Sequence, residues 1–283
     1  MIISVRNSQV ALARRLHRAS VRQRDGLVLL EGPHLVTEAA QAGILQTVLV
    51  ADYPKPDIKL AADAAADAGA RVLTAAPHVL AAAADSASRQ AIVAIGRRPQ
   101  VAALDGTPLI LVIDGVQDPG NVGTLVRSGA AAGATLIVRT PGSADPFGPK
   151  AMRAGVGAHF RIPIRDAATP NELSALAEGV HLYEASADAE RAYHRTDWTG
   201  PSGLVVGAET RGVSSAWRAA CRDTVGVPME RGVESLNAAA AAAVILFEAA
   251  RPRPARPPRF THAARAALRP AERPPRRGVQ RPG

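Results

Sequence analysis

The stretch that decides the fold runs from residue 225 to residue 251 and reads Val225-Gly-Val-Pro-Met-Glu-Arg-Gly-Val-Glu-Ser-Leu-Asn-Ala-Ala-Ala-Ala-Ala-Ala-Val-Ile-Leu-Phe-Glu-Ala-Ala-Arg251. A short apolar run stops at Pro228, and a polar turn follows. A long helix then begins near Ser235, a residue suited to the N-cap or first turn. Six consecutive alanines favour the helix strongly and let another backbone approach closely. The string predicts either a tightly packed core helix or a polar site at the amides that begin it.

Two other apolar strands also end in polar, Gly-rich loops. Strand 108–113 runs into Asp114-Gly-Val-Gln-Asp-Pro-Gly-Asn-Val-Gly123, and strand 203–206 runs into Gly207-Ala-Glu-Thr-Arg-Gly212. With strand 225–227, these ends are expected at one carboxyl edge, where open α/β sheets bind ligands. The loops contain neither G-x-G-x-x-G nor a P-loop, which disfavours a nicotinamide or ATP enzyme.

The order of the predicted elements indicates two α/β domains and a tail. Residues 1–98 alternate strands with helices and predict a smaller domain with a partly parallel sheet, and residues 99–107 form a linker. Residues 108–251 predict a larger domain with a parallel sheet covered on both faces. Among the individual predictions are a basic amphipathic helix over 1–24, a helix over 124–132 and a strand over 160–164.

The net charge of +9 belongs entirely to the last part of the chain, because residues 251–283 hold ten arginines and the single acid Glu272. The first 250 residues are balanced. The segment 252–283 is rich in Arg and Pro and is predicted to be disordered, because it has too little apolar surface to offset the entropy of ordering. It suits contact with a polyanion such as RNA, and a solvated tail without a specific role is the alternative.

The helix predicted at the N-terminus has an apolar stripe and a strongly basic side. A basic stripe at the start of a domain is a candidate RNA-binding surface, and a solvated face is the alternative reading. The candidate RNA-binding residues are Arg6, Arg14, Arg15, Arg18 and Arg22.

Several classes of protein are disfavoured by composition. No apolar run is long enough for a membrane helix, and the N-terminus has no signal pattern. The single cysteine, Cys221, excludes an internal disulfide and a cysteine-based metal site, and it is read as a small buried residue rather than a nucleophile. The seven histidines show no ligand spacing, so we expect no metal. A cytoplasmic location is the simple inference.

Taken together, the three loops resemble the SpoU (TrmH) family of RNA ribose 2′-O-methyltransferases, within the SPOUT superfamily. The matching segments are 118–127, 204–214 and 227–237 with the alanine-rich helix, and the resemblance covers roughly residues 105–250. The segment 26–38 is similar to the small L30e-like RNA-binding domain that precedes many members. That second likeness favours a ribosomal-RNA enzyme over the single-domain transfer-RNA type.

The resemblance implies a fold, a cofactor and an assembly. The expected fold is a C-terminal SPOUT-type α/β domain with a deep trefoil knot, after a smaller N-terminal α/β L30e-like domain. S-adenosylmethionine is expected in the knot and a homodimer through the knot domain, with RNA as the partner. The residues carried over for the cofactor are Gly207, Val227 and Leu236, through main-chain groups, and Met229.

The resemblance also implies Arg127 as the catalytic residue, assigned in the family as the base. A guanidinium stays protonated because its pKa lies above about 12, so we hypothesise instead that Arg127 grips the target phosphate and lowers the effective pKa of the adjacent hydroxyl. The residues expected to orient this guanidinium and the ribose are Asn121, Glu209, Ser235 and Asn237.

The sequence leaves the substrate open. A transfer-RNA methylase and a catalytically silent RNA-binding or ribosome-associated protein remain alternatives, as do housekeeping and antibiotic-resistance roles in 23S rRNA. Two positions depart from the family pattern: Arg231 stands where many members have Gly, and Gly155 stands where a Ser is common. Both departures concern local contacts to the substrate.

Overall fold

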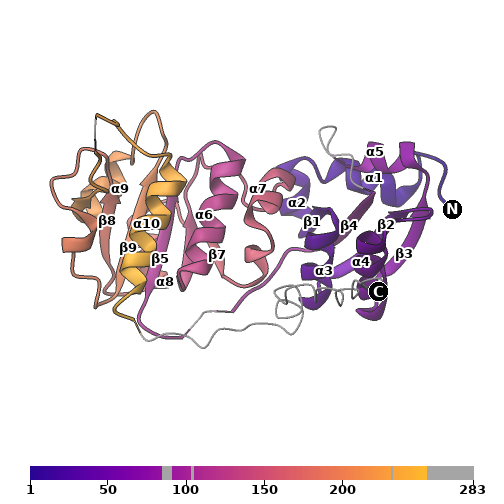
Figure 1. The fold of residues 1–283 in the computed structure, drawn as a ribbon, viewed down its shortest axis with the longest axis horizontal. Coiled ribbons are helices and arrows are strands. Elements are labelled where there is room, and N and C mark those ends of the chain that lie inside the picture. Colours follow the sequence, from indigo (N-terminus) through magenta and orange to yellow (C-terminus); the bar gives the residue numbers. More distant parts are fainter. Residues whose placement is uncertain (85–90, 103–104, 231, 254–283) are drawn as a thin grey trace, which may run out of the picture. The chain divides into compact units, whose positions relative to one another are not determined.

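A computed structural model describes residues 1–84, 91–102, 105–230 and 232–253 (Figure 1). Residues 1–253 form one unit, and the predicted tail beyond Arg253 lies outside the described residues. The domain boundary predicted near residue 100 stays a prediction. None of the described helices is both long and apolar enough to cross a membrane.

The N-terminal sheet has four strands in the order β1-β4-β2-β3, and only β2 and β3 are parallel. This agrees with the partly parallel sheet expected from the sequence. Its strands are β1 Leu27–Glu31, β2 Leu45–Ala51, β3 Arg71–Ala75 and β4 Ile92–Arg97. The helices of this part are α1 Ser8–Arg15, α2 Ala19–Asp25, α3 Pro33–Gln41, α4 Pro56–Asp67 and α5 Pro77–Ala83.

The C-terminal sheet has six strands in the order β10-β8-β9-β5-β6-β7, and every neighbouring pair is parallel. Its central strand β5 is buried along its whole length, as the continuous apolar run predicts. The strands are β5 Leu109–Asp114, β6 Leu136–Arg139, β7 Ile164–Asp166, β8 His181–Ala185, β9 Ser202–Gly207 and β10 Cys221–Val225.

Helices cover both faces of this sheet. Alternate residues of β5 and β9, including Leu111 and Leu204, pack with α6 and α10, whereas Val112 and Val205 pack with Leu173 of α8 and with α9. In Figure 1, α6 and α10 run side by side. The helices are α6 Pro119–Ala131, α7 Pro149–Gly155, α8 Pro170–Leu176, α9 Ser215–Ala220 and α10 Ala238–Ala250, with 3₁₀ turns η1 Ala158–Phe160 and η2 Tyr193–Arg195.

The prediction of one helix over residues 1–24 is wrong, because α1 and α2 are separated near Arg18. Leu16 and Val21 are both buried. On one continuous helix they would point about 140° apart. The break lets both side chains reach the core.

The strand predicted over 160–164 is also wrong, since η1 takes up its first residue and β7 starts only at Ile164. Pro163 has no amide to donate to a ladder, so regular pairing begins after it. The last strand is β10, Cys221–Val225, rather than 225–227. Because β10 lies at the edge of the sheet, polar residues such as Arg222 are tolerated in it, and the apolar pattern does not mark it.

Two helices begin at other residues than expected. Helix α6 starts at Pro119 rather than Thr124, because the carboxylate of Asp118 caps it by accepting from the amide of Asn121 at 2.9 Å. Helix α10 is capped by Asn237 and not by Ser235: the Asn237 side chain accepts from the amides of Ala239 and Ala240.

Candidate functional site

The loops that follow β8, β9 and β10 enclose a cavity of ≈ 380 Å³ at the carboxyl edge of the parallel sheet. A volume of this size is enough to bury a small organic ligand. All four residues expected to hold a cofactor line it, although they come from separate loops: Gly207, Val227, Met229 and Leu236. The structure therefore brings the predicted cofactor set together, while its role stays a prediction.

A polar network ties three strand-end loops together beside this cavity. The side-chain amide of Asn121, on α6, donates to Oε1 of Glu209 at 2.7 Å. The amide of Asn237 donates to the same Oε1 at 3.1 Å and to Oδ1 of Asn121 at 3.2 Å. Residues 121, 209 and 237 thus form one hydrogen-bonded triangle, although the chain separates the first from the last by 116 residues.

Each corner of the triangle is held by the local structure. Asn121 lies in the first turn of α6, next to the capping carboxylate of Asp118. Lys150 bonds the other oxygen of that carboxylate at 2.6 Å and, with backbone amides, keeps the pKa of Asp118 below its usual range. Asn237 is held because its Oδ1 caps α10, which turns its amide toward the other two residues.

The loop that carries Glu209 begins at a position where only glycine fits. A Cβ on Gly207 would lie 2.1 Å from the carbonyl carbon of Gly212, where the loop turns back on itself. The far end of the loop is fixed by Asp114, a buried carboxylate that accepts from the Ser214 amide and from the Thr140 hydroxyl, each at 2.7 Å. No sequence motif marks Asp114 as this anchor.

Ser235 and Arg127 lie differently with respect to the network. Ser235 lines the cavity together with Glu209. Arg127 is exposed on α6, and within the described residues it has no hydrogen-bond or ion-pair partner. The structure therefore groups Asn121, Glu209 and Asn237, places Ser235 beside them, and leaves Arg127 outside the network.

Acidic side chains dominate the charge of the cavity. Glu184, Asp188 and Glu209 line it, and Arg218 is the one cation among the described lining residues. Arg218 is itself paired with the buried Glu184 at 3.0 Å, and this contact raises the pKa of the guanidinium. Sequence reasoning missed Glu184 and Arg218. Glu184 follows apolar strand residues, and its partner comes from α9, 34 residues later.

The structure gives a reason for one departure from the family pattern. A Cβ on Gly155 would lie 2.2 Å from Cε1 of His159, so a serine does not fit beside this buried ring. Burial lowers the pKa of His159 to about 4, which keeps the imidazole neutral. The other departure, Arg231, lies outside the described residues.

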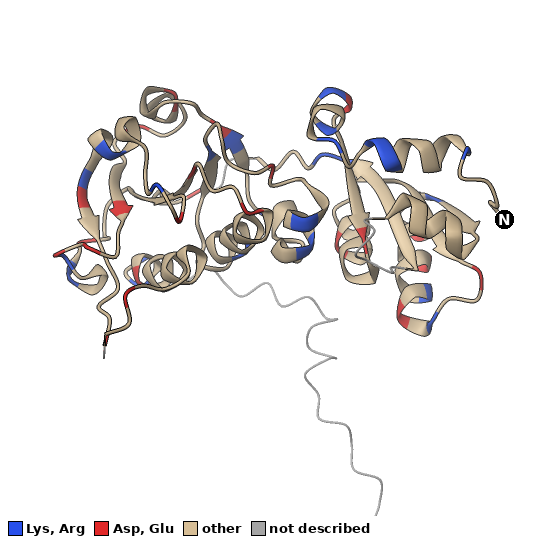
Figure 2. Ribbon diagram, turned by 90° about the horizontal axis from the view of Figure 1, so that it is seen from above, with Lys and Arg blue, Asp and Glu red and all other residues tan. Residues whose placement is uncertain are grey.

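The predicted RNA-binding arginines differ in their exposure to solvent. Arg6, Arg14, Arg15 and Arg18 are exposed, and Figure 2 shows basic residues on the helices next to the N-terminus. The prediction for Arg22 is corrected: it is buried, pairs with Asp145 at 2.6 Å and donates to the carbonyls of residues 16 and 17. The helical break near Arg18 turns Arg22 inward.

Two other features bear on chemistry. Burial raises the pKa of the Cys221 thiol to about 12, so the thiolate is scarce at neutral pH, as expected for a residue that is not a nucleophile. No group of three or more His, Cys, Asp or Glu residues within the described part of the chain is arranged to hold a metal ion.

The fold defines a class of α/β protein, in which a six-stranded parallel sheet with a cavity at its carboxyl edge follows a four-stranded mixed sheet. Comparison with known proteins defines it further. Residues 108–247 match the SpoU rRNA Methylase family, and residues 7–94 match the MRM3-like substrate binding domain.

The chain belongs to the SpoU rRNA methylase family. It is 32% identical to the 23S rRNA (guanosine(2553)-2′-O)-methyltransferase RlmP of Bacillus subtilis, with 87% of this chain and 97% of the relative covered. The mitochondrial rRNA methyltransferase 3 of Homo sapiens is 29% identical over 81% of this chain and 69% of its own length. The structure of the SpoU methyltransferase AviRb from Streptomyces viridochromogenes, in complex with AdoMet, matches with a TM-score of 0.75 and 27% identity over 87% of this chain and 98% of that one.

Proposed function

We propose that this chain transfers the methyl group of S-adenosylmethionine to a ribose 2′-hydroxyl of ribosomal RNA, most specifically 23S rRNA. The observation that carries the proposal is the Asn121–Glu209–Asn237 triangle beside the cavity at the carboxyl edge. The relatives named above supply the reaction and the class of RNA.

The cavity fits S-adenosylmethionine in shape and in charge. Small residues border it on several sides, so main-chain groups of Gly207, Val227 and Leu236 are accessible for the polar edge of an adenine, with Met229 as an apolar contact. The cofactor carries positive charge on its sulfonium and its amino group. The carboxylates of Asp188 and Glu209 favour such a cation.

The bound cofactor supplies an activated methyl group, so the protein has to position the 2′-hydroxyl and help it to lose its proton. Arg127 is exposed and has no partner among the described residues, so it is available for a phosphate of the RNA, which it is able to grip with two parallel hydrogen bonds. A guanidinium beside the hydroxyl favours its ionised form. Arg127 then acts by electrostatics and not by accepting the proton, which would pass to solvent as the 2′-oxygen bonds to the methyl carbon and the carbon–sulfur bond of the cofactor breaks.

The triangle orients the reacting groups. Both amides donate to Oε1 of Glu209, which leaves Oε2, for which the described residues provide no donor, to accept from Arg127 or from the ribose. Ser235, on the cavity wall, is a second group of the right size to contact the ribose. This assignment gives a role to Arg127, which the resemblance implies as catalytic, and to the four residues expected to orient it and the ribose.

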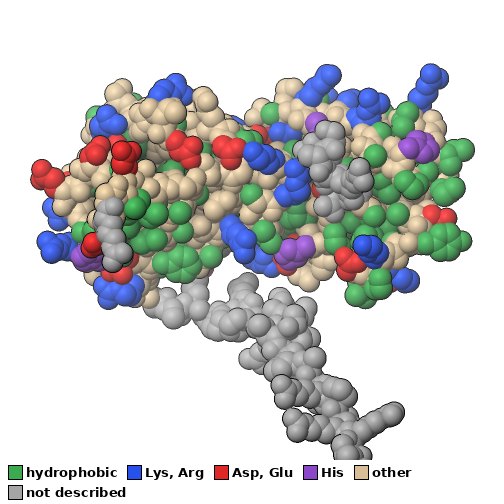
Figure 3. Space-filling model, turned by 45° about the horizontal axis from the view of Figure 1, so that its top comes forward, with side chains coloured by type: hydrophobic (Ala, Val, Ile, Leu, Met, Phe, Trp, Pro, Cys, Tyr) green, Lys and Arg blue, Asp and Glu red, His purple; other side chains and the backbone are tan. Residues whose placement is uncertain are grey.

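We also infer a homodimer through the knot domain. Helix α10 leaves Val244 38% and Phe247 55% exposed, although it is otherwise strongly apolar. In Figure 3, hydrophobic side chains gather on the C-terminal domain, where α10 lies. Covering this face with a second copy would remove apolar surface from water. A trefoil knot is supported by the chain path, since β10 lies outside β8 and the chain then returns to pack α10 against α6.

The N-terminal arginines and the Arg-rich tail support RNA as the partner, and we place the protein in the cytoplasm with its RNA. The test is methyl transfer from labelled S-adenosylmethionine to 23S rRNA fragments and to transfer RNA, followed by mapping of the 2′-O-methyl site. We expect incorporation into one ribose of 23S rRNA. Transfer only to tRNA would overturn the assignment of rRNA as the substrate. Absence of cofactor binding in calorimetry would overturn the assignment of methyltransferase activity.

A further inference from the structure

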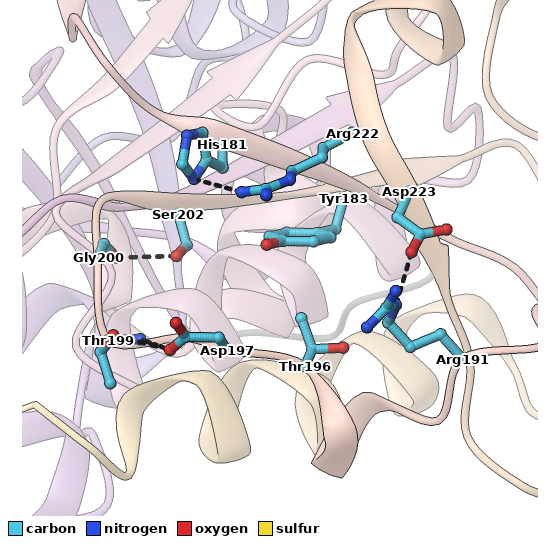
Figure 4. Close-up of a pocket in the computed structure, with 10 residues that line it drawn as sticks. All are labelled: His181, Tyr183, Arg191, Thr196, Asp197, Thr199, Gly200, Ser202, Arg222 and Asp223. Atoms are coloured by element: carbon cyan, nitrogen blue, oxygen red, sulfur yellow. Dashed lines mark hydrogen bonds and ion pairs between the residues drawn. The ribbon is translucent and has the colours of Figure 1, made fainter.

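A second cavity, of ≈ 450 Å³, lies near the opposite edge of the parallel sheet, where β8, β9 and β10 begin (Figure 4). His181 and Ser202 are the first residues of β8 and β9, and Arg222 is the second residue of β10. Tyr183 belongs to the same face of β8 as His181. The cofactor cavity uses Glu184 and Ala185 at the other end of this strand, so the two cavities are separate.

The cavity exists because the connection from β8 to β9 has no α-helix to cover the edge of the sheet. Residues 186–201 contain only the 3₁₀ turn η2, where a parallel crossover usually has an α-helix. This connection packs Trp198 against Tyr183, with ring centroids 4.9 Å apart. The rest of the connection covers the sheet edge incompletely, so the beginnings of three strands remain accessible behind it.

One wall of the cavity presents hydrogen-bond donors. Nη1 of Arg222 donates to Nδ1 of His181 at 3.3 Å. A ring nitrogen that accepts leaves the proton on the other one, so Nε2 of His181 carries the N–H and points away from Arg222 (Figure 4). The remaining donors of the Arg222 guanidinium have no partner within the described residues. His181 thus helps to hold the guanidinium in place, and the remaining N–H groups of Arg222 suit a phosphate group.

The opposite wall presents an acceptor. One oxygen of Asp197 accepts from the amide and the hydroxyl of Thr199, at 3.0 and 2.7 Å, and this pair of contacts lowers the pKa of the carboxyl. In Figure 4, the ring of Tyr183 lies between the Arg222–His181 pair and Asp197. The second oxygen of Asp197 has no donor among the described residues, so it is available for a hydroxyl or amino group.

We propose that this cavity binds one nucleoside monophosphate unit, with its phosphate at the guanidinium of Arg222, which His181 helps to hold, and its sugar or base at Asp197. The volume is too large for a lone phosphate and is suited to a nucleotide-sized ligand. The remaining charges on the wall cancel, because Arg191 is paired with Asp223 at 2.6 Å. The site is independent of the methyl-transfer site, and the unit comes either from free nucleotide or from an RNA strand.

Calorimetry on the full chain tests the proposal, with AMP, GMP, CMP and UMP in one arm and a single-stranded hexanucleotide RNA in the other. We expect at least one arm to bind with a Kd below about 1 mM. Arg222→Ala raises that Kd at least about tenfold, since a charge-assisted contact to phosphate is lost. Asp197→Asn raises it about fivefold. The arm that binds identifies the source of the nucleotide.

The matched control is Arg195→Ala, which removes an exposed arginine of η2 that does not line the cavity and leaves the Kd unchanged. Arg222→Gln and circular dichroism check that the fold persists. Binding in neither arm, or binding that Arg222→Ala leaves intact, overturns the proposal. S-adenosylmethionine affinity is measured on the same samples and is expected to be unchanged, so a failure here is distinct from a failure of the methyltransferase assignment.

Discussion

The two sheets of this protein differ in what their strand directions allow. All strands of the C-terminal sheet run the same way, so the loops after β8, β9 and β10 emerge at one edge and line one cavity, and Asn121, after β5, bonds to Glu209 beside it. In the N-terminal sheet β1, β2 and β3 run one way, but β4 lies between β1 and β2 and runs the other way, so it separates the carboxyl end of β1 from those of β2 and β3. The C-terminal sheet therefore brings residues that are distant in the sequence together at its carboxyl edge. In the N-terminal part, basic residues lie on the helices that precede the sheet.

This difference predicts that substitutions at the parallel edge change the chemical step, whereas substitutions in the N-terminal part change stability or RNA affinity. Arg127→Ala is expected to have the largest effect, a loss in kcat of about 10³-fold, as for removal of a group that stabilises developing charge. Single-turnover methylation with saturating cofactor measures it, and cofactor affinity is the control. Turnover that remains near normal would contradict both catalytic roles considered for Arg127.

Arg22→Ala tests whether the N-terminal part uses this arginine for structure instead of RNA. The variant leaves the largely buried carboxylate of Asp145 without its cation, with only the Phe147 amide still donating to it, and breaking such a pair costs about 3 kcal/mol. Chemical denaturation measures the free energy of unfolding. The exposed Arg18→Ala is the matched control and should change stability by less than about 0.5 kcal/mol. Equal effects in both variants would refute the structural role.

Substitutions of Asn237 distinguish its role as the cap of α10 from its role in the polar triangle. Asn237→Asp retains an oxygen that caps α10 but places a carboxylate against Glu209, so we expect unchanged stability and a kcat lower by about thirtyfold, for about 2 kcal/mol of lost contacts. Asn237→Ala should lose about 1 kcal/mol of stability as well. Thermal unfolding and turnover are measured on both variants. Full activity of Asn237→Asp would show that the triangle does not position the reacting groups.

The smallest expected effect is in the N-terminal part. The triple variant of Arg14, Arg15 and Arg18 to Ala should weaken RNA binding about tenfold and reduce the slope of log affinity against log salt by up to about 2, since about 0.7 is lost for each phosphate contact to a single strand. Filter binding across a salt series measures this, and kcat at saturating RNA should be unchanged. An unaltered salt slope would assign these arginines to a solvated face.

The sequence predicted the α/β class, both types of sheet and the carboxyl-edge loops, because continuous apolar runs and Gly-rich turns mark them locally. Recognition of the family depended on three separated motifs and not on periodicity. Arg22 was assigned to the wrong environment because its helix breaks to bury two apolar residues, which is a tertiary requirement. Glu184 was missed because its partner Arg218 is brought to it only by the fold.

Asn237 couples two processes that are usually treated separately. Its Oδ1 holds the first amides of α10 while its amide holds the triangle, so any ligand that restrains the triangle also restrains the start of the helix. By thermodynamic linkage, occupation of the cavity should slow amide hydrogen exchange at Ala239 and Ala240, where the helix opens by fraying. The exchange rates of these two amides would then report, without any turnover, whether the site is assembled.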